Sequence, residues 1–180
     1  MKATKLLLIA LSCMLIVGCK KSQNEPEESQ PQGTTTVITE DQLKSYFPYA
    51  VGDKIVFRND DQFYDYTYTV KVYYFTNQAG KMNLTVSMKG SDSSSIDPEV
   101  LSIELKAEVT DNKILKIDFE NSIKNMPKSI VTGTYTYDAS KKDELPEKIT
   151  LSNGAIIKEK KGLVYYEDYE SGEWYFLKRK

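Results

Sequence analysis

The chain has 180 residues, with 24 lysines and arginines against 26 aspartates and glutamates, and a formal net charge of −2. This length fits one domain, and the balanced charge predicts no basic surface for nucleic acid. The chain contains no histidine, which excludes Ser-His-Asp catalysis, Cys-His catalysis and histidine-bound zinc within it. No glycine-rich nucleotide-binding motif occurs either. We therefore expect a protein without enzyme activity, catalytic residues, a metal or a cofactor.

The N-terminus has the parts of an export signal. Two lysines accompany an apolar run from Leu6 to Val17, which is too short to cross a bilayer because a spanning helix takes roughly 20 residues. The run ends in IVGC at 16–19, which resembles the bacterial lipobox. In precursors with this motif, the cysteine thiol is acylated and cleavage falls just before it. The resemblance implies that residues 1–18 are a signal peptide and that Cys19 carries the lipid that attaches the protein to a membrane.

A polar tract follows the cysteine. Residues 20–36 include no aliphatic or aromatic side chain, so they cannot bury enough surface to offset the entropy of ordering. We expect residues 19–36 to be a lipidated, flexible tether. The acidic stretch at 25–28 loosely resembles the signals that direct Bacteroidetes lipoproteins to the cell surface. The expected location is the outer membrane, and its periplasmic face and the cell surface both stay open.

Residues 37–180 are expected to form a single β-rich domain that opens with a short helix. TEDQ at 39–42 fits a capping box with acidic residues in the first turn. Leu43 and Phe47 then fall on one face at helical spacing, and a proline follows. The pattern predicts a helix over 40–47 that packs both side chains onto the rest of the domain.

After this helix, apolar residues alternate with polar ones at the period of β-strands. One long strand is predicted to place six residues on a single face: Tyr64, Tyr66, Tyr68, Val70, Val72 and Tyr74. Ser-Asn-Gly at 152–154 predicts a hairpin turn, and LVYYEDY is expected to pair with EWYFLKR at the C-terminus. Nine or ten strands with short links require antiparallel neighbours, and closing such a long sheet removes its edges.

We therefore predict an all-β, antiparallel, up-and-down meander that forms a barrel or half-barrel. A two-sheet β-sandwich is the alternative. A transmembrane barrel is excluded, because the polar faces of these strands carry too many lysines and glutamates to meet lipid.

Two segments resemble known proteins. YFPYAVGDKIVF at 46–57 and KGLVYY at 161–166 are similar to the opening and closing segments of many small, uncharacterised Bacteroidetes lipoproteins, which have a lipobox, a polar linker and a β-rich domain. The likeness covers roughly residues 13–58 and 155–180. It implies an envelope lipoprotein with a fold that is lipocalin-like in places, and it implies no activity, because fold alone does not specify function.

The 13 tyrosines supply the candidate ligand site. An aromatic-lined cavity or barrel mouth suits an apolar or glycan ligand. The alternative is a tyrosine-rich core whose hydroxyls reach its rim. The candidate ligand-binding residues are Tyr64, Tyr66, Tyr68, Tyr135, Tyr137 and Trp174.

Two clusters of acidic and amide side chains offer other chemistry. The last hairpin carries Glu167, Asp168, Glu170 and Glu173, and glycoside hydrolysis uses such paired carboxylates when they lie in a cleft. The run Asn59-Asp60-Asp61, with Asp65, offers oxygen ligands for calcium but lacks the spacing and the glycine of an EF-hand loop, so a polar turn is the simpler interpretation.

We thus expect a non-enzymatic, membrane-anchored envelope lipoprotein that binds a small apolar or glycan ligand, or a protein partner, through its aromatic-rich β domain. One alternative is a structural or inhibitory surface lipoprotein with a solid core. The other is a carboxylate-dependent hydrolase.

Overall fold

The computed structural model describes residues 37–59, 64–91, 99–141, 144–168 and 172–180. Within these ranges the chain forms ten strands and one short helix, α1 (Glu40–Ser45). The strands are β1 (Lys54–Asn59), β2 (Tyr64–Gln78), β3 (Lys81–Ser91), β4 (Leu101–Thr110), β5 (Ile114–Ile123), β6 (Met126–Asp138), β7 (Lys148–Thr150), β8 (Ile156–Lys158), β9 (Gly162–Asp168) and β10 (Gly172–Arg179).

All ten of these strands belong to one antiparallel sheet in the order β6-β5-β4-β3-β2-β1-β10-β9-β8-β7. The strands follow one another as a meander, and its first and last strands, β1 and β10, pair with each other. The sheet is thereby nearly closed into a barrel, and the remaining gap lies between β6 and β7. The predicted all-β, antiparallel barrel is confirmed.

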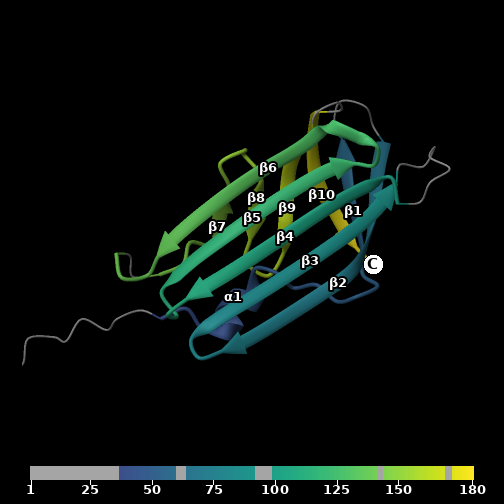
Figure 1. The fold of residues 1–180 in the computed structure, drawn as a ribbon. Helices are drawn as coiled ribbons and strands as arrows, with labels where there is room; N and C mark the ends of the chain where they lie inside the picture. The colour runs from purple at the N-terminus through teal and green to yellow at the C-terminus, as the bar shows by residue number, and fades with distance from the viewer. Residues whose placement is uncertain (1–36, 60–63, 92–98, 142–143, 169–171) are drawn as a thin grey trace, which may run out of the picture. The chain divides into compact units, whose positions relative to one another are not determined.

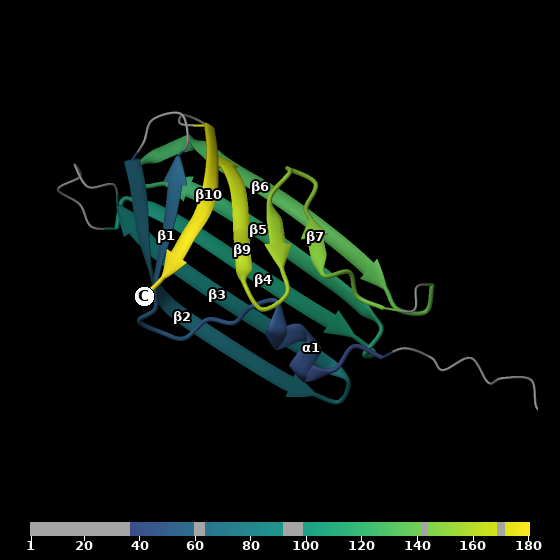
Figure 2. The same ribbon diagram turned by 180° about the vertical axis from the view of Figure 1, so that it is seen from behind.

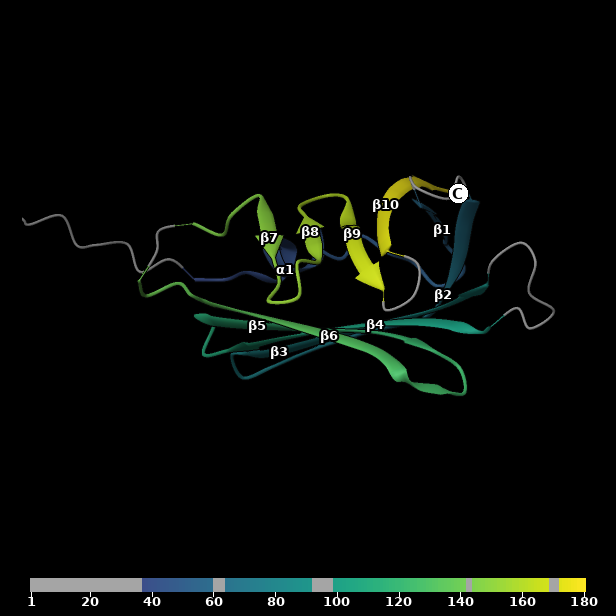
Figure 3. The ribbon, with the colours of Figure 1, turned by 90° about the horizontal axis from the view of Figure 1, so that it is seen from above.

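The sheet has two walls of different character, which face each other across the interior (Figure 3). The long wall consists of β2 to β6, and Figure 1 shows these strands running side by side. The short wall consists of β1, β10, β9, β8 and β7, which Figure 2 shows in front of the long wall. The inward residues of both walls form the hydrophobic core.

The alternation in the sequence produces this core directly. In β3 and β4, every second side chain is buried and the residues between them are more exposed. Successive side chains of a strand point to opposite faces, so one apolar face can turn inward while a polar face meets water.

The long strand β2 departs from the predicted alternation. Its pairing with β3 shifts register between Val70 and Val72. A bulge of this kind adds one residue and exchanges the faces of everything beyond it. Tyr73 and Phe75 therefore pack against the core, while Val72 and Tyr74 are 44% and 58% exposed. The prediction that Val72 and Tyr74 share the face of Tyr68 is wrong for this reason.

The short helix has the predicted capping box. The Thr39 hydroxyl accepts from the Gln42 backbone N–H at 3.2 Å, and the Gln42 side chain accepts from the Thr39 N–H at 2.8 Å. Leu43 and Phe47 are completely buried, as predicted. The helix ends at Ser45, two residues earlier than predicted. No helix in the described part of the chain is long and apolar enough to cross a membrane.

The gap in the barrel is bridged by the turn between β7 and β8. The Ser152 N–H donates to the Thr134 carbonyl at 2.9 Å, and the Thr134 N–H donates to the Ser152 hydroxyl at 3.0 Å. Gly133 lies beside them on β6, and a Cβ at that position would be 1.9 Å from Asn153 Oδ1. The turn can approach β6 this closely because Gly133 has no side chain.

Candidate functional site

Three of the predicted ligand residues belong to a packed aromatic cluster inside the barrel. The rings of Tyr66 and Trp174 stack with centroids 3.7 Å apart and planes 16° apart, and Tyr166 lies beyond the tryptophan at 6.2 Å. Phe57 meets Tyr68 and Tyr166 edge-on, at 5.9 and 5.1 Å. The Phe57 contacts have the perpendicular geometry that aromatic pairs prefer, whereas Tyr66 and Trp174 stack nearly face to face.

The polar atoms of this cluster have partners. The hydroxyls of Tyr68 and Tyr166 are 2.9 Å apart and share one hydrogen bond. Burial raises the pKa of both phenols well above the ordinary value, because a phenolate would lose its hydration. The Trp174 indole N–H donates to the Asp168 carboxylate at 2.9 Å. Both phenols therefore stay protonated and neutral at physiological pH.

The other predicted ligand residues lie elsewhere or outside the description. On β6, Tyr137 is buried and Tyr135 is half-buried. Both contribute to the raised pKa of Tyr46, which follows α1. Burial raises the pKa of Tyr46 to about 12, with smaller contributions from Glu159 and from these two tyrosines. No ring contact joins Tyr135 or Tyr137 to the Trp174 cluster among the described side chains. Cys19 and the side chain of Tyr64 lie outside the described residues.

The inward aromatic side chains thus have little free surface. Tyr66 is 8% exposed, and Tyr68 and Trp174 are fully buried. A ligand at these residues would have to displace the ring contacts that the side chains make with one another. Their role in ligand binding stays a prediction.

A second aromatic group lies on the outer face of the short wall, and we call it the outer patch: Ile156, Val164, Tyr165 and Tyr175. The partly buried Phe176, which packs against the core and Phe57, borders the same groove. Tyr165 lies directly opposite Tyr175 on β10 and opposite Ile156 on β8. The two tyrosine rings are 5.1 Å apart and inclined by 53°. The patch, with Lys148 and Lys158, lines a surface groove of about 390 Å³. Side chains from three adjacent strands therefore form one exposed apolar surface.

Two carboxylates hold the rings of the outer patch in place. The Tyr165 hydroxyl donates to Glu167 at 2.6 Å, and the Tyr175 hydroxyl donates to Glu173 at 2.5 Å. Desolvation and the hydrogen bond to Glu167 raise the pKa of the Tyr165 phenol well above its ordinary value. The rings are thus oriented before any ligand arrives, which reduces the entropy lost on binding.

The outer patch combines three kinds of contact. Its rings offer flat apolar surface, Glu167 and Glu173 offer hydrogen-bond acceptors, and Lys148 and Lys158 offer donors at the opposite end of the groove. A ligand that carries apolar faces edged by hydroxyls, as a sugar does, matches this combination.

The sequence interpretation did not include Tyr165 and Tyr175 among the site residues. Each stands next to an inward aromatic residue, Tyr166 or Trp174. Which member of each pair faces outward depends on the strand register. A usable signal was present, since each outer tyrosine has a glutamate two positions away on its own strand and therefore on the same face.

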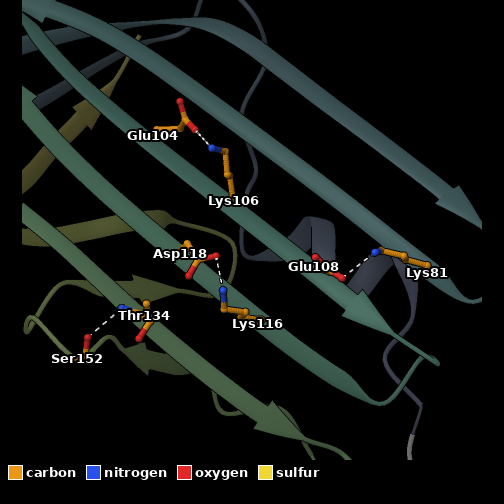
Figure 4. Close-up of polar contacts among 8 residues, drawn as sticks. All are labelled: Lys81, Glu104, Lys106, Glu108, Lys116, Asp118, Thr134 and Ser152. Carbon is orange, nitrogen blue, oxygen red and sulfur yellow. Dashed lines mark hydrogen bonds and ion pairs between the residues drawn. The ribbon is translucent and has the colours of Figure 1, made fainter.

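The outer face of the long wall is different, because its charges are paired with each other (Figure 4). Lys81 contacts Glu108 at 2.9 Å and Lys116 contacts Asp118 at 3.0 Å. Lys106 contacts Glu104, beside a shallow pocket of about 180 Å³. These exposed ion pairs contribute little to stability, and they leave the wall close to neutral and well solvated.

The acidic candidates have other partners or lie outside the description. Glu167 and Glu173 accept the phenol hydrogen bonds of the outer patch, and Asp168 accepts from Trp174. Glu170 and residues 60–61 of the calcium candidate are not among the described residues. Within the described ranges, no group of three or more acidic or cysteine side chains is arranged to hold a metal ion.

Comparison with protein-family models, with curated proteins and with solved structures finds no match to this chain. Function must therefore be inferred from its own residues.

Proposed function

We propose that the protein is a non-enzymatic, lipid-anchored protein of the bacterial cell envelope that binds a glycan on its outer patch. The observation that carries the proposal is the pair formed by the half-buried Tyr165 and the exposed Tyr175, which are oriented by hydrogen bonds to Glu167 and Glu173. The lipobox-like sequence ending at Cys19 supports the anchor, and the expected location is the outer membrane.

The outer patch is favoured over the barrel interior because its surface is accessible. Tyr175 is 38% exposed, whereas Trp174, its neighbour in the chain, is completely buried. The inward tyrosines have ring and hydroxyl partners within the core. A ligand on the outer patch gains contacts without breaking any of these interactions.

For the anchor, we expect Cys19→Ala to abolish recovery of the protein in the membrane fraction, because the thiol that would carry the acyl chains is lost. The measurement is cell fractionation with immunodetection, together with mass spectrometry of the N-terminal peptide. Cys13→Ala is the matched control, since Cys13 precedes the predicted cleavage point, and it should leave fractionation unchanged. Persistent membrane recovery of Cys19→Ala would contradict the anchor.

For the outer patch, Tyr165→Ser/Tyr175→Ser should weaken glycan binding by roughly tenfold or more, because the central aromatic contacts are removed. The measurement is native affinity electrophoresis of the full chain in gels that contain polysaccharide extracted from bacterial envelopes.

Tyr74→Ser is the matched control, because Tyr74 is 58% exposed on β2, away from the outer patch, and its replacement should leave mobility in these gels as in the wild type. Equal retardation of the double variant and the wild type would contradict binding at the outer patch. No retardation of the wild type in any polysaccharide would contradict the glycan and favour a protein partner.

A further inference from the structure

A basic groove lies next to α1, where the chain enters the β domain. It measures about 420 Å³ and is lined by four lysines and two glutamates: Glu147, Lys148, Lys158, Glu159, Lys160 and Lys161. It shares Lys148 and Lys158 with the groove of the outer patch but extends along the turn between β8 and β9. Its lining therefore has an excess of positive charge, in a protein whose net charge is −2.

Three of the four lysines in this groove form no ion pair with a carboxylate among the described residues. Lys148 lies directly opposite Lys158 in the β7–β8 pair, and like charges in facing positions are destabilising. Neither lysine forms an ion pair with any described residue, and Lys160 makes only a long contact of 3.8 Å with Glu159. On the long wall, by contrast, lysines in similar positions have carboxylate partners (Figure 4).

A backbone hydrogen bond fixes the groove beside α1. Lys160 has a left-handed φ of 63°, and its N–H donates to the Ser45 carbonyl at the end of α1, at 2.6 Å. Its side chain points outward and is 82% exposed. The first described residue is Val37, three positions before α1, and the Ile38 N–H donates to the Asn112 carbonyl in the turn between β4 and β5 at 2.7 Å. Figure 2 shows α1 beside the turn that leads into β9.

We propose that the basic groove binds the headgroup phosphates of an anionic membrane, the membrane into which the lipid anchor inserts. This inference rests on the proposed anchor at Cys19. A tether of this length and composition spans roughly 25 Å, which lets the domain reach the bilayer surface. Each lysine near an anionic bilayer strengthens the attraction about fivefold.

The test uses the full chain as produced in a bacterial host, in two kinds of vesicle, one of phosphatidylcholine alone and one mixed with phosphatidylglycerol. Brief lysine acetylation, read by mass spectrometry, reports which lysines are covered. We expect the labelling of Lys148, Lys158, Lys160 and Lys161 to fall about fivefold on the anionic vesicles and to recover in high salt. Lys81, Lys106 and Lys116 on the long wall are internal controls and should label equally on both.

A variant pair strengthens this test. Lys148→Gln/Lys158→Gln should remove most of the protection at Lys160 and Lys161, whereas Lys106→Gln/Lys116→Gln should leave it intact. A third arm, in detergent with inorganic phosphate, distinguishes a membrane from a free anion. Protection by inorganic phosphate equal to that by anionic vesicles would overturn the membrane assignment.

The outcomes separate this inference from the proposed anchor. If the protein floats with both kinds of vesicle but the groove lysines label equally on both, the groove does not bind the membrane. The proposed lipid attachment at Cys19 is then unaffected. If the protein floats with anionic vesicles alone and the groove lysines are protected, the lipid attachment at Cys19 is contradicted and membrane binding by the groove is supported. Flotation with neither vesicle overturns both.

Discussion

Replacing Trp174 with alanine should lower the free energy of unfolding by about 3–5 kcal/mol. Trp174 is completely buried and stacks between Tyr66 and Tyr166, which come from opposite sides of the β1–β10 pair. Removing it leaves a large cavity and deprives the Asp168 carboxylate of the indole donor. The measurement is equilibrium unfolding in denaturant, followed by circular dichroism because the only tryptophan is lost.

Trp174→Phe separates the contribution of the ring contacts from that of the indole hydrogen bond to Asp168. It keeps an aromatic ring in the stack and removes the N–H, so it should lower the free energy of unfolding clearly less than Trp174→Ala does. Tyr175→Ala, at the adjacent outward position, should cost less still, because Tyr175 is 38% exposed. A Trp174→Ala variant that loses less than about 1 kcal/mol would show that the aromatic cluster is not the packed core described here.

Gly133→Ala should lower the free energy of unfolding by about 1–3 kcal/mol, although alanine is normally preferred over glycine within a strand. The reason is the 1.9 Å approach of the new Cβ to Asn153 Oδ1. To relieve it, either the Asn153 side chain rotates and loses its hydrogen bond from the Ala155 N–H, or the β7–β8 turn moves away from β6 and loses its hydrogen bonds to Thr134. The measurement is again equilibrium unfolding, with Thr136→Ala at an exposed position of β6 as the control.

Asn153→Ala should rescue the glycine variant. All three atoms nearest to the added Cβ belong to the Asn153 side chain, so Gly133→Ala should cost much less when Asn153 is alanine. Asn153→Ala alone has its own cost, because Asn153 Oδ1 accepts from the Ala155 N–H at 3.3 Å. Purely additive costs in the double-mutant cycle would contradict a direct clash and point to an effect elsewhere in β6.

The fold could be predicted because its dominant determinant, the period-two alternation, is local. The capping box before α1 and the Ser-Asn-Gly turn are equally local, and both occur as predicted. The bulge in β2 could not be predicted, since Val70, Val72 and Tyr74 continue the alternation in the sequence. The bulge exchanges the inward and outward faces of β2, so that Tyr73 and Phe75 pack inward.

The candidate site was harder to predict, because it depends on pairing between distant strands. Tyr165 and Tyr166 are neighbours of the same residue type, yet one is on the outer patch and the other in the core. Only the registers of β9 with β8 and β10 decide between them. The position of the barrel gap could not be predicted either, since β6 and β7 are consecutive in the chain but do not pair.

The central claim is that the tyrosines divide into a packed core and an outer patch that binds a glycan. Hydroxyl-radical footprinting of the full chain, with and without envelope polysaccharide, tests both parts. In the free protein, Tyr74 and Tyr175 should be oxidised readily, and Tyr68 and Tyr166 hardly at all. Added polysaccharide should protect Tyr165 and Tyr175 and leave Tyr74 unchanged. Ready oxidation of Tyr68 and Tyr166, or saturating polysaccharide that leaves Tyr165 and Tyr175 unprotected, would contradict the account.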